Sequence, residues 1–369
     1  MNIYIALILF YLIVVIILNK IDNKIFNKYL LVLTLPILMF NIANADFETY
    51  SYIFESDDAL GLTEFGFRFL IRAIKFMGGE SYSWILIFTG ILIFITFSRY
   101  SKYIKNLNFI VLLYFIFPFM MDIIQIRNTI MVMFILNGIL EYALKRKKIA
   151  ILLILIGSAF HIYGIIWILL LVYIELIEKL NKTSCLDEVG VSYKKNLKYY
   201  RTTILIGILN ILLGSRIVNF IIEHSPIQMI SIKLNVYITH SNFDSLIVWG
   251  IFLIFDLVVF HYFIKKMSPP SNNFEVKKYR ITKFLYYLLW TGVMAMGMLL
   301  YIQEFNRFFR VLFLIKYLLF GTIDSYLARK DSFKLKAYLI IVSIIFAIIY
   351  YSRGIIYDSI IIENIIRLF

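Results

Sequence analysis

The chain has 369 residues, of which 62% are hydrophobic and 16% are charged. A soluble domain cannot bury that much apolar surface, and several apolar runs approach or exceed the roughly 18 residues that mark a membrane-spanning helix. The net charge of +14 sits in short loops between apolar runs, which indicates orientation in a lipid bilayer and argues against nucleic acid as a partner. Composition therefore predicts an all-α, polytopic integral membrane bundle.

The first apolar runs predict two spans separated by a basic loop. The run over 3–18 has no preceding basic region and no small-residue cleavage site, so we interpret it as a retained span rather than a signal peptide. Lys20, Lys24 and Lys28 follow it, which places this loop in the cytoplasm. The second span, over about 29–43, then leads into an acidic external segment over about 44–80.

The external segment contains the sequence GFRFLIRAIKFMGG, which is amphipathic at helical spacing. Its apolar face holds Phe67, Leu70, Ile71 and Ile74, and its basic face holds Arg68, Arg72 and Lys75. This pattern is typical of a helix that lies in the membrane interface. Two further spans are predicted over about 82–98 and 109–121.

The next apolar run extends from Arg127 to the basic cluster at 145–148. As a helix it measures about 27 Å, close to the ~30 Å of the hydrocarbon core. The basic cluster is then cytoplasmic, and Arg127 lies at the outer end beside Gln125 and Asn128. An arginine there departs from the positive-inside rule, so we favour a functional role for Arg127 over simple snorkelling.

The apolar run over 149–177 carries one histidine, His161, in its middle. A single helix of about 43 Å would place every later basic loop outside. We therefore predict a short-armed hairpin that turns near 161–164, below the outer surface. Irregular backbone at that depth must line protein or a water-filled cavity, so His161 would lie at the floor of an outward-facing cavity. A satisfied interior histidine, hydrogen-bonded to Ser158, is equally compatible with the sequence.

The second half continues the alternation of apolar runs and basic loops. Spans are predicted over about 202–222, 245–264, 284–301, 308–320 and 337–351, with cytoplasmic loops over about 178–201 and 265–283, an external segment over about 223–244 and an interfacial tail over about 352–369. The result is a single membrane domain over 1–369 with about twelve passes.

Several charged residues fall within or beside these later spans. Arg307 and Arg310 are three residues apart and share one helix face, where two guanidiniums suit a phosphate between them; pairing with Glu304 is the alternative. Arg216 lies in the outer third of its span. Asp256 and Lys316 are deep and opposite in charge, which predicts a structural pair.

Signatures of common cofactor and metal sites are missing from the sequence. The single Cys185 excludes an internal disulfide and a cysteine-based metal site. His224 and His240 have no third ligand at zinc spacing. There is no P-loop, GxGxxG, HExxH or GxSxG motif. We expect neither a cofactor nor a metal.

These residues, in this order, resemble the EpsG family of Wzy-like polymerases of bacterial exopolysaccharide and capsule synthesis. The matching features are Asp46, Tyr50, Glu64-Phe65-Gly66-Phe67, Gln125-x-Arg127-Asn128, Ala159-Phe160-His161, Lys233-x-x-x-Tyr237 and Arg307-x-x-Arg310. The family often shows an arginine and Gly-Thr-Asp before its first conserved tyrosine, whereas this chain has FNIANAD at 40–46.

The resemblance implies a membrane glycosyltransferase at the outer face of the cytoplasmic membrane. It would polymerise undecaprenyl-diphosphate-linked oligosaccharide repeats into exopolysaccharide, capsule or O-antigen, alongside a flippase and a chain-length regulator. A diphosphate leaving group requires preorganised positive charge and polar contacts, for which the candidates are Arg127, Arg307, Arg310, Gln125, Asn128, Arg216 and Tyr50. The acceptor hydroxyl requires a general base, for which the candidates are His161, Glu64 and Asp46, in that order.

Two other classes of function are compatible with the same features. A flippase or transporter of the lipid-linked oligosaccharide would also use broken helices and charge within the membrane. The two halves of this chain, however, show no corresponding interrupted segments. A membrane acyltransferase that modifies the polymer would also use one intramembrane histidine, but the paired outer arginines favour a diphosphate over a thioester.

Overall fold

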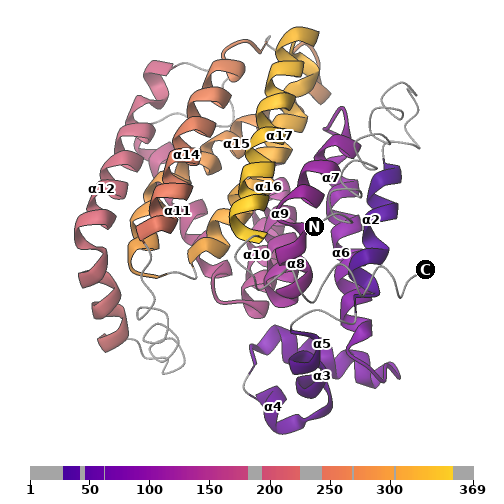
Figure 1. Ribbon diagram of the computed structural model, residues 1–369. Helices are drawn as coiled ribbons and strands as arrows, with labels where there is room; N and C mark the ends of the chain where they lie inside the picture. The colour runs from indigo at the N-terminus through magenta and orange to yellow at the C-terminus, as the bar shows by residue number, and fades with distance from the viewer. Residues whose placement is uncertain are drawn as a thin grey trace. The chain divides into compact units, whose positions relative to one another are not determined.

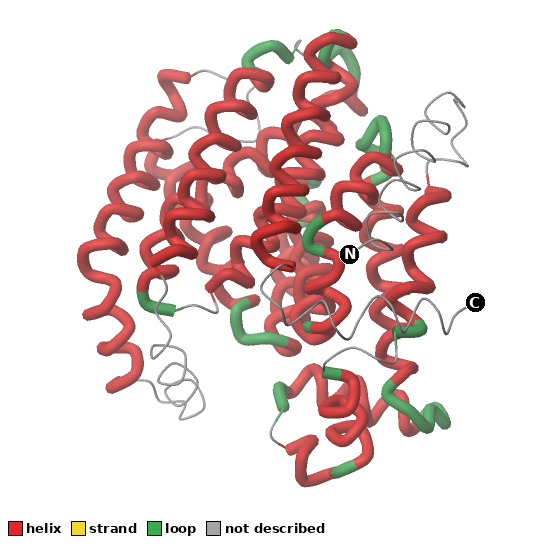
Figure 2. The backbone as a smooth tube through the Cα atoms, viewed as in Figure 1, coloured by secondary structure: helices red, strands yellow, loops and turns green. Residues whose placement is uncertain are grey.

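The computed structural model describes residues 28–41, 46–61, 63–181, 193–224, 243–267, 270–302 and 305–351. Regular structure in these ranges is helical throughout, and they contain no strand (Figure 1 and Figure 2). The predicted first span over 3–18 and the tail over 352–369 lie outside these ranges, as does most of the segment over 223–244. The all-α class expected from composition is confirmed for the residues described.

Four helical stretches in the described ranges are long and apolar enough to cross a membrane: Ser83–Tyr100, Ser245–Ile264, Asn273–Leu300 and Arg329–Tyr350. A fifth results if Tyr199–Arg216 and Val218–His224, which are bent by 51°, form one span. Shorter apolar helices cover Tyr29–Met39, Leu107–Ile116 and Gly164–Ile177. These helices indicate a multi-pass membrane protein. The number of about twelve passes stays a prediction.

The chain divides into two compact units, which we describe separately. Unit 1 spans Met1–Ile168, Phe320–Ser325 and Arg329–Phe369, and unit 2 spans Leu169–Leu319 and Tyr326–Ala328. Arg127 and His161 therefore belong to unit 1, whereas Arg307 and Arg310 belong to unit 2. The single membrane domain expected over 1–369 stays a prediction.

The apolar part of unit 1 contains α2 (Tyr29–Met39), α6 (Ser83–Tyr100), α7 (Leu107–Ile116), α8 (Phe119–Ile124), α9 (Ile126–Ala143), α10 (Lys147–Phe160) and α17 (Arg329–Tyr351). The span predicted over 109–121 is divided into α7 and α8 at Pro118, because proline has no N–H and its ring clashes with the preceding turn. Helices α9 and α10 pack closely. A Cβ on Gly138 would lie 3.0 Å from the Ala150 carbonyl oxygen.

A charge network ties α9 to α6 at the C-terminal end of α9. Arg99 of α6 forms an ion pair with the buried Glu141 and donates a hydrogen bond to Asn137 Oδ1 at 2.7 Å. Asn137 in turn donates to Thr96 Oγ1 at 2.7 Å, and Arg146 donates to Glu141 at 3.3 Å. Because every member has a partner, the network holds one register of α9 against α6.

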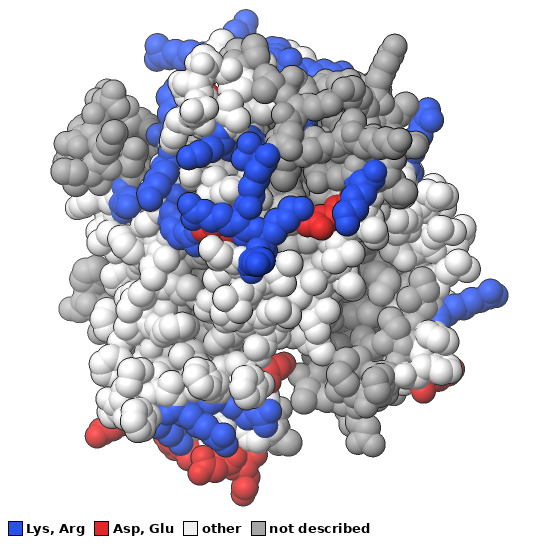
Figure 3. All heavy atoms as spheres, turned by 180° about the vertical axis from the view of Figure 1, so that it is seen from behind, with Lys and Arg blue, Asp and Glu red and all other residues white. Residues whose placement is uncertain are grey.

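The external segment predicted over 44–80 forms three helices: α3 (Phe47–Glu55), α4 (Asp57–Gly61) and α5 (Phe65–Phe76). The predicted apolar face of α5 is buried, with Phe67, Leu70, Ile71 and Ile74 among its buried residues. The other face leaves Phe65 and Phe69 about two-thirds exposed, at 68% and 65%. Figure 3 shows acidic side chains gathered over these helices, beside a group of basic ones. The placement of α5 in the outer membrane interface stays a prediction.

Unit 2 is built, in whole or in large part, from α11 (Gly164–Asn181), α12 (Tyr193–His224), α14 (Phe243–Ile264), α15 (Asn273–Ala295), η2 (Met296–Leu300) and α16 (Asn306–Ile323). Helices α12 and α15 begin inside the basic loops predicted over 178–201 and 265–283. Asn272 caps α15, because its Oδ1 accepts hydrogen bonds from the backbone of Phe274 and Glu275 at 3.0 and 2.9 Å. Both helices therefore begin before the spans that the sequence predicts over about 202–222 and 284–301.

A buried ion pair joins α14 and α16 inside unit 2. Lys316 Nζ lies 3.0 Å from Asp256 Oδ2, and the two side chains are 0% and 6% exposed. The ammonium also lies 3.6 Å from the centroid of the Phe313 ring. The structural pair predicted from the sequence is confirmed.

Removing one member of this pair should destabilise unit 2 more than removing both. Lys316→Met or Asp256→Leu alone leaves an uncompensated buried charge, which costs about 3–5 kcal/mol. The double variant carries no buried charge, so we expect it to recover most of the lost thermal stability and membrane abundance. The melting temperatures of the purified single and double variants measure this recovery of stability. Equal losses in the double and single variants would contradict a purely structural pair.

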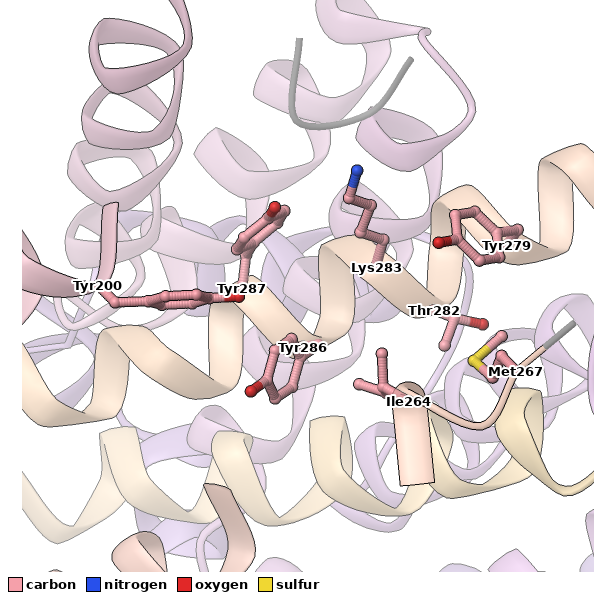
Figure 4. Close-up of a pocket in the computed structure, with 8 residues that line it drawn as sticks. All are labelled: Tyr200, Ile264, Met267, Tyr279, Thr282, Lys283, Tyr286 and Tyr287. Carbon is pink, nitrogen blue, oxygen red and sulfur yellow. The ribbon is translucent and has the colours of Figure 1, made fainter. Parts of the chain in front are cut away.

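A small hollow lies among the N-terminal part of α12, the end of α14 and α15 (Figure 4). It is lined by Tyr200, Ile264, Met267, Tyr279, Thr282, Lys283, Tyr286 and Tyr287. Figure 4 shows that the ammonium of Lys283 points away from Ile264 and Met267. The volume is about 10 Å³, which is enough for one water molecule.

Candidate functional site

Arg127 lies in the first turn of α9 and contacts side chains from two other segments of unit 1. Its Nε donates a hydrogen bond to the Tyr50 hydroxyl at 3.0 Å, and its Nη1 forms an ion pair with Glu64. Tyr50 belongs to α3, and Glu64 is the residue that precedes α5. The structure thus brings together three site residues that lie far apart in the sequence.

Aromatic rings surround the guanidinium of Arg127. Its Cζ lies 5.4 Å from the centroid of the Tyr50 ring and 5.8 Å from that of Phe67, within the range of cation–π attraction. Tyr50 also stacks on Tyr82, with ring centroids 5.4 Å apart. We refer to Tyr50, Glu64, Phe67, Tyr82 and Arg127 as the Arg127 cluster.

Tyr82 is the member of this cluster that the sequence analysis missed. The only feature of the sequence that could have indicated it is its position at the start of a predicted span. It is 2% exposed, and its hydroxyl has no hydrogen-bond partner among the described residues. Asp46, the residue before α3, lies close enough to act on it electrostatically.

The start of α5 packs directly on the end of α10 at Gly66. A Cβ at this position would lie 2.7 Å from the carbonyl carbon of Ala159 and 2.8 Å from its oxygen. Only glycine permits that approach, because both neighbours are backbone atoms of a helix. Gly66 is two residues after Glu64, and Ala159 is two residues before His161. The contact therefore brings the Arg127 cluster next to the segment that carries His161.

Gly66→Ala should separate these two segments. The added methyl overlaps the α10 backbone, and such overpacking typically costs about 1–3 kcal/mol. We expect a lower melting temperature and a large loss of function in a protein that still inserts into the membrane. Gly61→Ala is the matched control, because a Cβ at Gly61 meets nothing within 4 Å. An equal effect of both substitutions on melting would show that the Gly66 contact is not specific.

His161 ends α10, and the helix resumes at Gly164, so the break lies where the sequence predicted it. The imidazole is 5% exposed and stacks on the Tyr163 ring at 5.2 Å. Its Nδ1 accepts a long hydrogen bond of 3.4 Å from the Tyr163 backbone N–H. A neutral ring that accepts at Nδ1 carries its proton on Nε2. In this arrangement His161 presents an N–H donor at Nε2, and its role as general base stays a prediction.

Asn128 and Gln125, the two polar residues close to Arg127 in the sequence, differ in their surroundings. Asn128 is 1% exposed, and neither atom of its amide has a hydrogen-bond partner among the described residues. An unsatisfied buried amide costs about 1–3 kcal/mol, so Asn128 is available to a polar ligand. Gln125 precedes α9, and its backbone carbonyl accepts from the Thr129 N–H at 3.0 Å. Ligand contacts for both residues stay predictions.

The arginines of the second half lie in unit 2. Arg310 is 2% exposed within α16, Arg307 is partly exposed in the first turn of that helix, and Arg216 is exposed on α12. The N-terminus of a helix favours an anion, which is compatible with a phosphate near Arg307 and Arg310. Their participation in one site with Arg127 stays a prediction. Lys233, Tyr237, His240 and Glu304 lie outside the described residues.

A buried carboxylate near the Arg127 cluster was also missed from the sequence. Asp122 is 1% exposed and accepts a hydrogen bond from the Tyr114 hydroxyl at 3.0 Å. Its backbone carbonyl accepts from Thr129 Oγ1 at 2.7 Å, which links α8 to the first turn of α9. Asp122 could have been identified from the sequence, because it is an aspartate within an apolar run. Among the described residues, no group of three or more His, Cys, Asp or Glu side chains is arranged to hold a metal ion.

Comparison with known families gives a match over most of the chain. The model of the EpsG family matches residues 28–362, which is most of the chain. Comparison with curated proteins and with solved structures gives no match. The matched range includes the Arg127 cluster, His161 and both arginines of α16.

Proposed function

Because this chain belongs to the EpsG family, we propose that it is a membrane glycosyltransferase that polymerises lipid-linked oligosaccharide repeats. The donor is the growing chain on undecaprenyl diphosphate, and the acceptor is a sugar hydroxyl of the next lipid-linked repeat. The reaction takes place at the outer face of the cytoplasmic membrane. The products are exopolysaccharide, capsule or O-antigen, and a flippase and a chain-length regulator act with the enzyme.

The observation that carries this proposal is the Arg127 cluster packed against the end of α10. Glu64, Arg127 and His161 come from three separate segments of unit 1, and the close contact between Gly66 and Ala159 brings these segments together. A charged group within a membrane bundle costs at least ~2.5–3.5 kcal/mol on insertion scales, so such groups usually serve a function. Here a guanidinium and a carboxylate meet, and the segment that carries an imidazole packs beside the start of α5, which suits acid–base chemistry on an anionic substrate.

Each group has a role in the transfer reaction. The diphosphate leaving group gains negative charge as the anomeric C–O bond breaks, and Arg127 is placed to stabilise that charge. His161 donates a hydrogen bond through Nε2 to an oxygen that becomes negative in the transition state. Asn128 contributes a polar contact to the substrate. Arg307, Arg310 and Arg216 provide further positive charge for the second diphosphate lipid.

The test is a lipid analysis of a deletion strain, combined with a probe of sidedness. Loss of the polymerase should leave single lipid-linked repeats exposed on the outer face, with no polymer. Repeats retained on the inner face would instead identify a flippase, and unmodified polymer of normal length would identify an acyltransferase. Complementation with the intact chain should restore the polymer.

A further inference from the structure

Two of the five N–H donors of Arg127 have an acceptor within the described part of the protein. Nε donates to the Tyr50 hydroxyl, and Nη1 pairs with Glu64. The side chain is 26% exposed, so a ligand can reach it. A phosphate binds arginine most strongly through two adjacent N–H groups. An oxyanion that binds the Nη1–Nη2 edge of the guanidinium approaches the nitrogen that already pairs with Glu64, so the two anions compete for Arg127.

Glu64 is the partner that can leave. Tyr50 is 6% exposed and is held by packing on both sides, with Tyr82 stacked at 5.4 Å and Phe67 edge-on at 5.5 Å. Glu64 lies in extended backbone before α5, and its side chain makes no cap hydrogen bond to that helix. A diphosphate carries more negative charge than a carboxylate, and it also repels the carboxylate beside it.

Resting on the proposed function, we infer that the donor diphosphate replaces Glu64 on Arg127 and that the released carboxylate is the general base for the acceptor hydroxyl. A carboxylate paired with arginine is a poor proton acceptor, because the neighbouring positive charge favours its ionised form. Once the pair is broken, the same carboxylate accepts a proton more readily. The base thus becomes effective only when the donor is bound.

The transfer step then balances as follows. The acceptor hydroxyl oxygen forms a bond to the anomeric carbon of the donor chain, and its proton passes to the Glu64 carboxylate. The bond between the anomeric carbon and the diphosphate oxygen breaks, and the electron pair leaves with undecaprenyl diphosphate held by Arg127. When the product lipid departs, Glu64 loses its proton to water and pairs with Arg127 again.

Glu64→Gln separates this inference from a purely structural role of the pair. The variant removes both the competing charge and the base. With the full chain in nanodiscs, we expect it to bind farnesyl diphosphate at least as tightly as the wild type. Its turnover on lipid-linked repeats should fall about 10²–10⁴-fold, as expected for the loss of a general base. Glu64→Asp, which keeps a carboxylate, should retain more turnover than Glu64→Gln.

Glu55→Gln is the matched control, because Glu55 is an exposed carboxylate at the end of α3. It should behave like the wild type in both measurements. Weaker binding of farnesyl diphosphate by Glu64→Gln would overturn the inference, because it would show that Glu64 only anchors Arg127. Unchanged turnover in that variant would overturn it as well.

The pH dependence of the wild type provides a second readout that does not depend on any variant. At limiting donor, Glu64 is paired, and its ionised form is favoured. With saturating donor the pairing is lost, so the acid-side loss of activity should begin at a higher pH in kcat than in kcat/KM for the donor. If kcat and kcat/KM lose activity at the same acid pH, the inference about Glu64 is overturned, but the proposed polymerase function still stands. A wild-type protein that binds farnesyl diphosphate but never polymerises would refute the proposed function itself.

Discussion

Arg127→Lys is expected to abolish most polymer synthesis in a protein that is still inserted and abundant. The guanidinium reaches Tyr50 and Glu64 at the same time and lies beside two aromatic rings. A lysine ammonium is a point charge on a flexible stem and cannot reproduce this arrangement. Loss of one charge-assisted hydrogen bond costs about 1.5–3 kcal/mol, which lowers turnover roughly 10- to 100-fold. Single lipid-linked repeats should accumulate.

Polymer yield, lipid-linked repeats and membrane abundance should be measured together in the same strains. Arg201→Lys is the matched control, because Arg201 is exposed near the beginning of α12. We expect wild-type polymer from it. If Arg127→Lys also makes wild-type polymer at normal abundance, Arg127 has only a structural role, and the diphosphate must be bound elsewhere.

Substitution of His161 should have a comparably large effect and should distinguish its two ring nitrogens. The Asn side chain places an oxygen near the position of Nδ1, so His161→Asn can keep the bond to the Tyr163 N–H while losing Nε2. We expect it to fold normally and to lose about 10²–10³ in turnover, as for removal of one preorganised donor. The Gln side chain reaches the position of Nε2 and can donate from there, so His161→Gln should retain more turnover.

Melting temperature and turnover of the two purified variants test this assignment. Wild-type turnover by His161→Asn would mean that His161 only braces the break between α10 and α11. Equal inactivity of His161→Asn and His161→Gln, with normal folding, would mean that proton acceptance is needed, and would return His161 to the role of base.

Much of the helical architecture was predictable from the chain alone. Arg127 and the basic cluster after it mark the ends of α9, because charged side chains stay out of the hydrocarbon core. The break at His161 follows from loop charge, because one unbroken helix would place every later basic loop outside, and the buried face of α5 follows from helical spacing. The Asp256–Lys316 pair was predictable because an isolated charge inside a bundle is too costly. These properties depend on local spacing and on the solvent around each segment.

The tertiary structure alone decided which residues of the candidate site meet. Arg127, Tyr50 and Glu64 are separated by 77 and 63 positions along the chain, and no spacing rule relates them. The approach of Gly66 to Ala159 depends on how two helices pack, and the sequence shows only a glycine. Which ring nitrogen of His161 faces the Tyr163 N–H is set by the backbone at the helix break. The sequence determined which residue types are present and how deep they lie, because those follow from composition and hydrophobicity. The pairing of Arg127 with Glu64 is a long-range contact, and only the packed chain determines it.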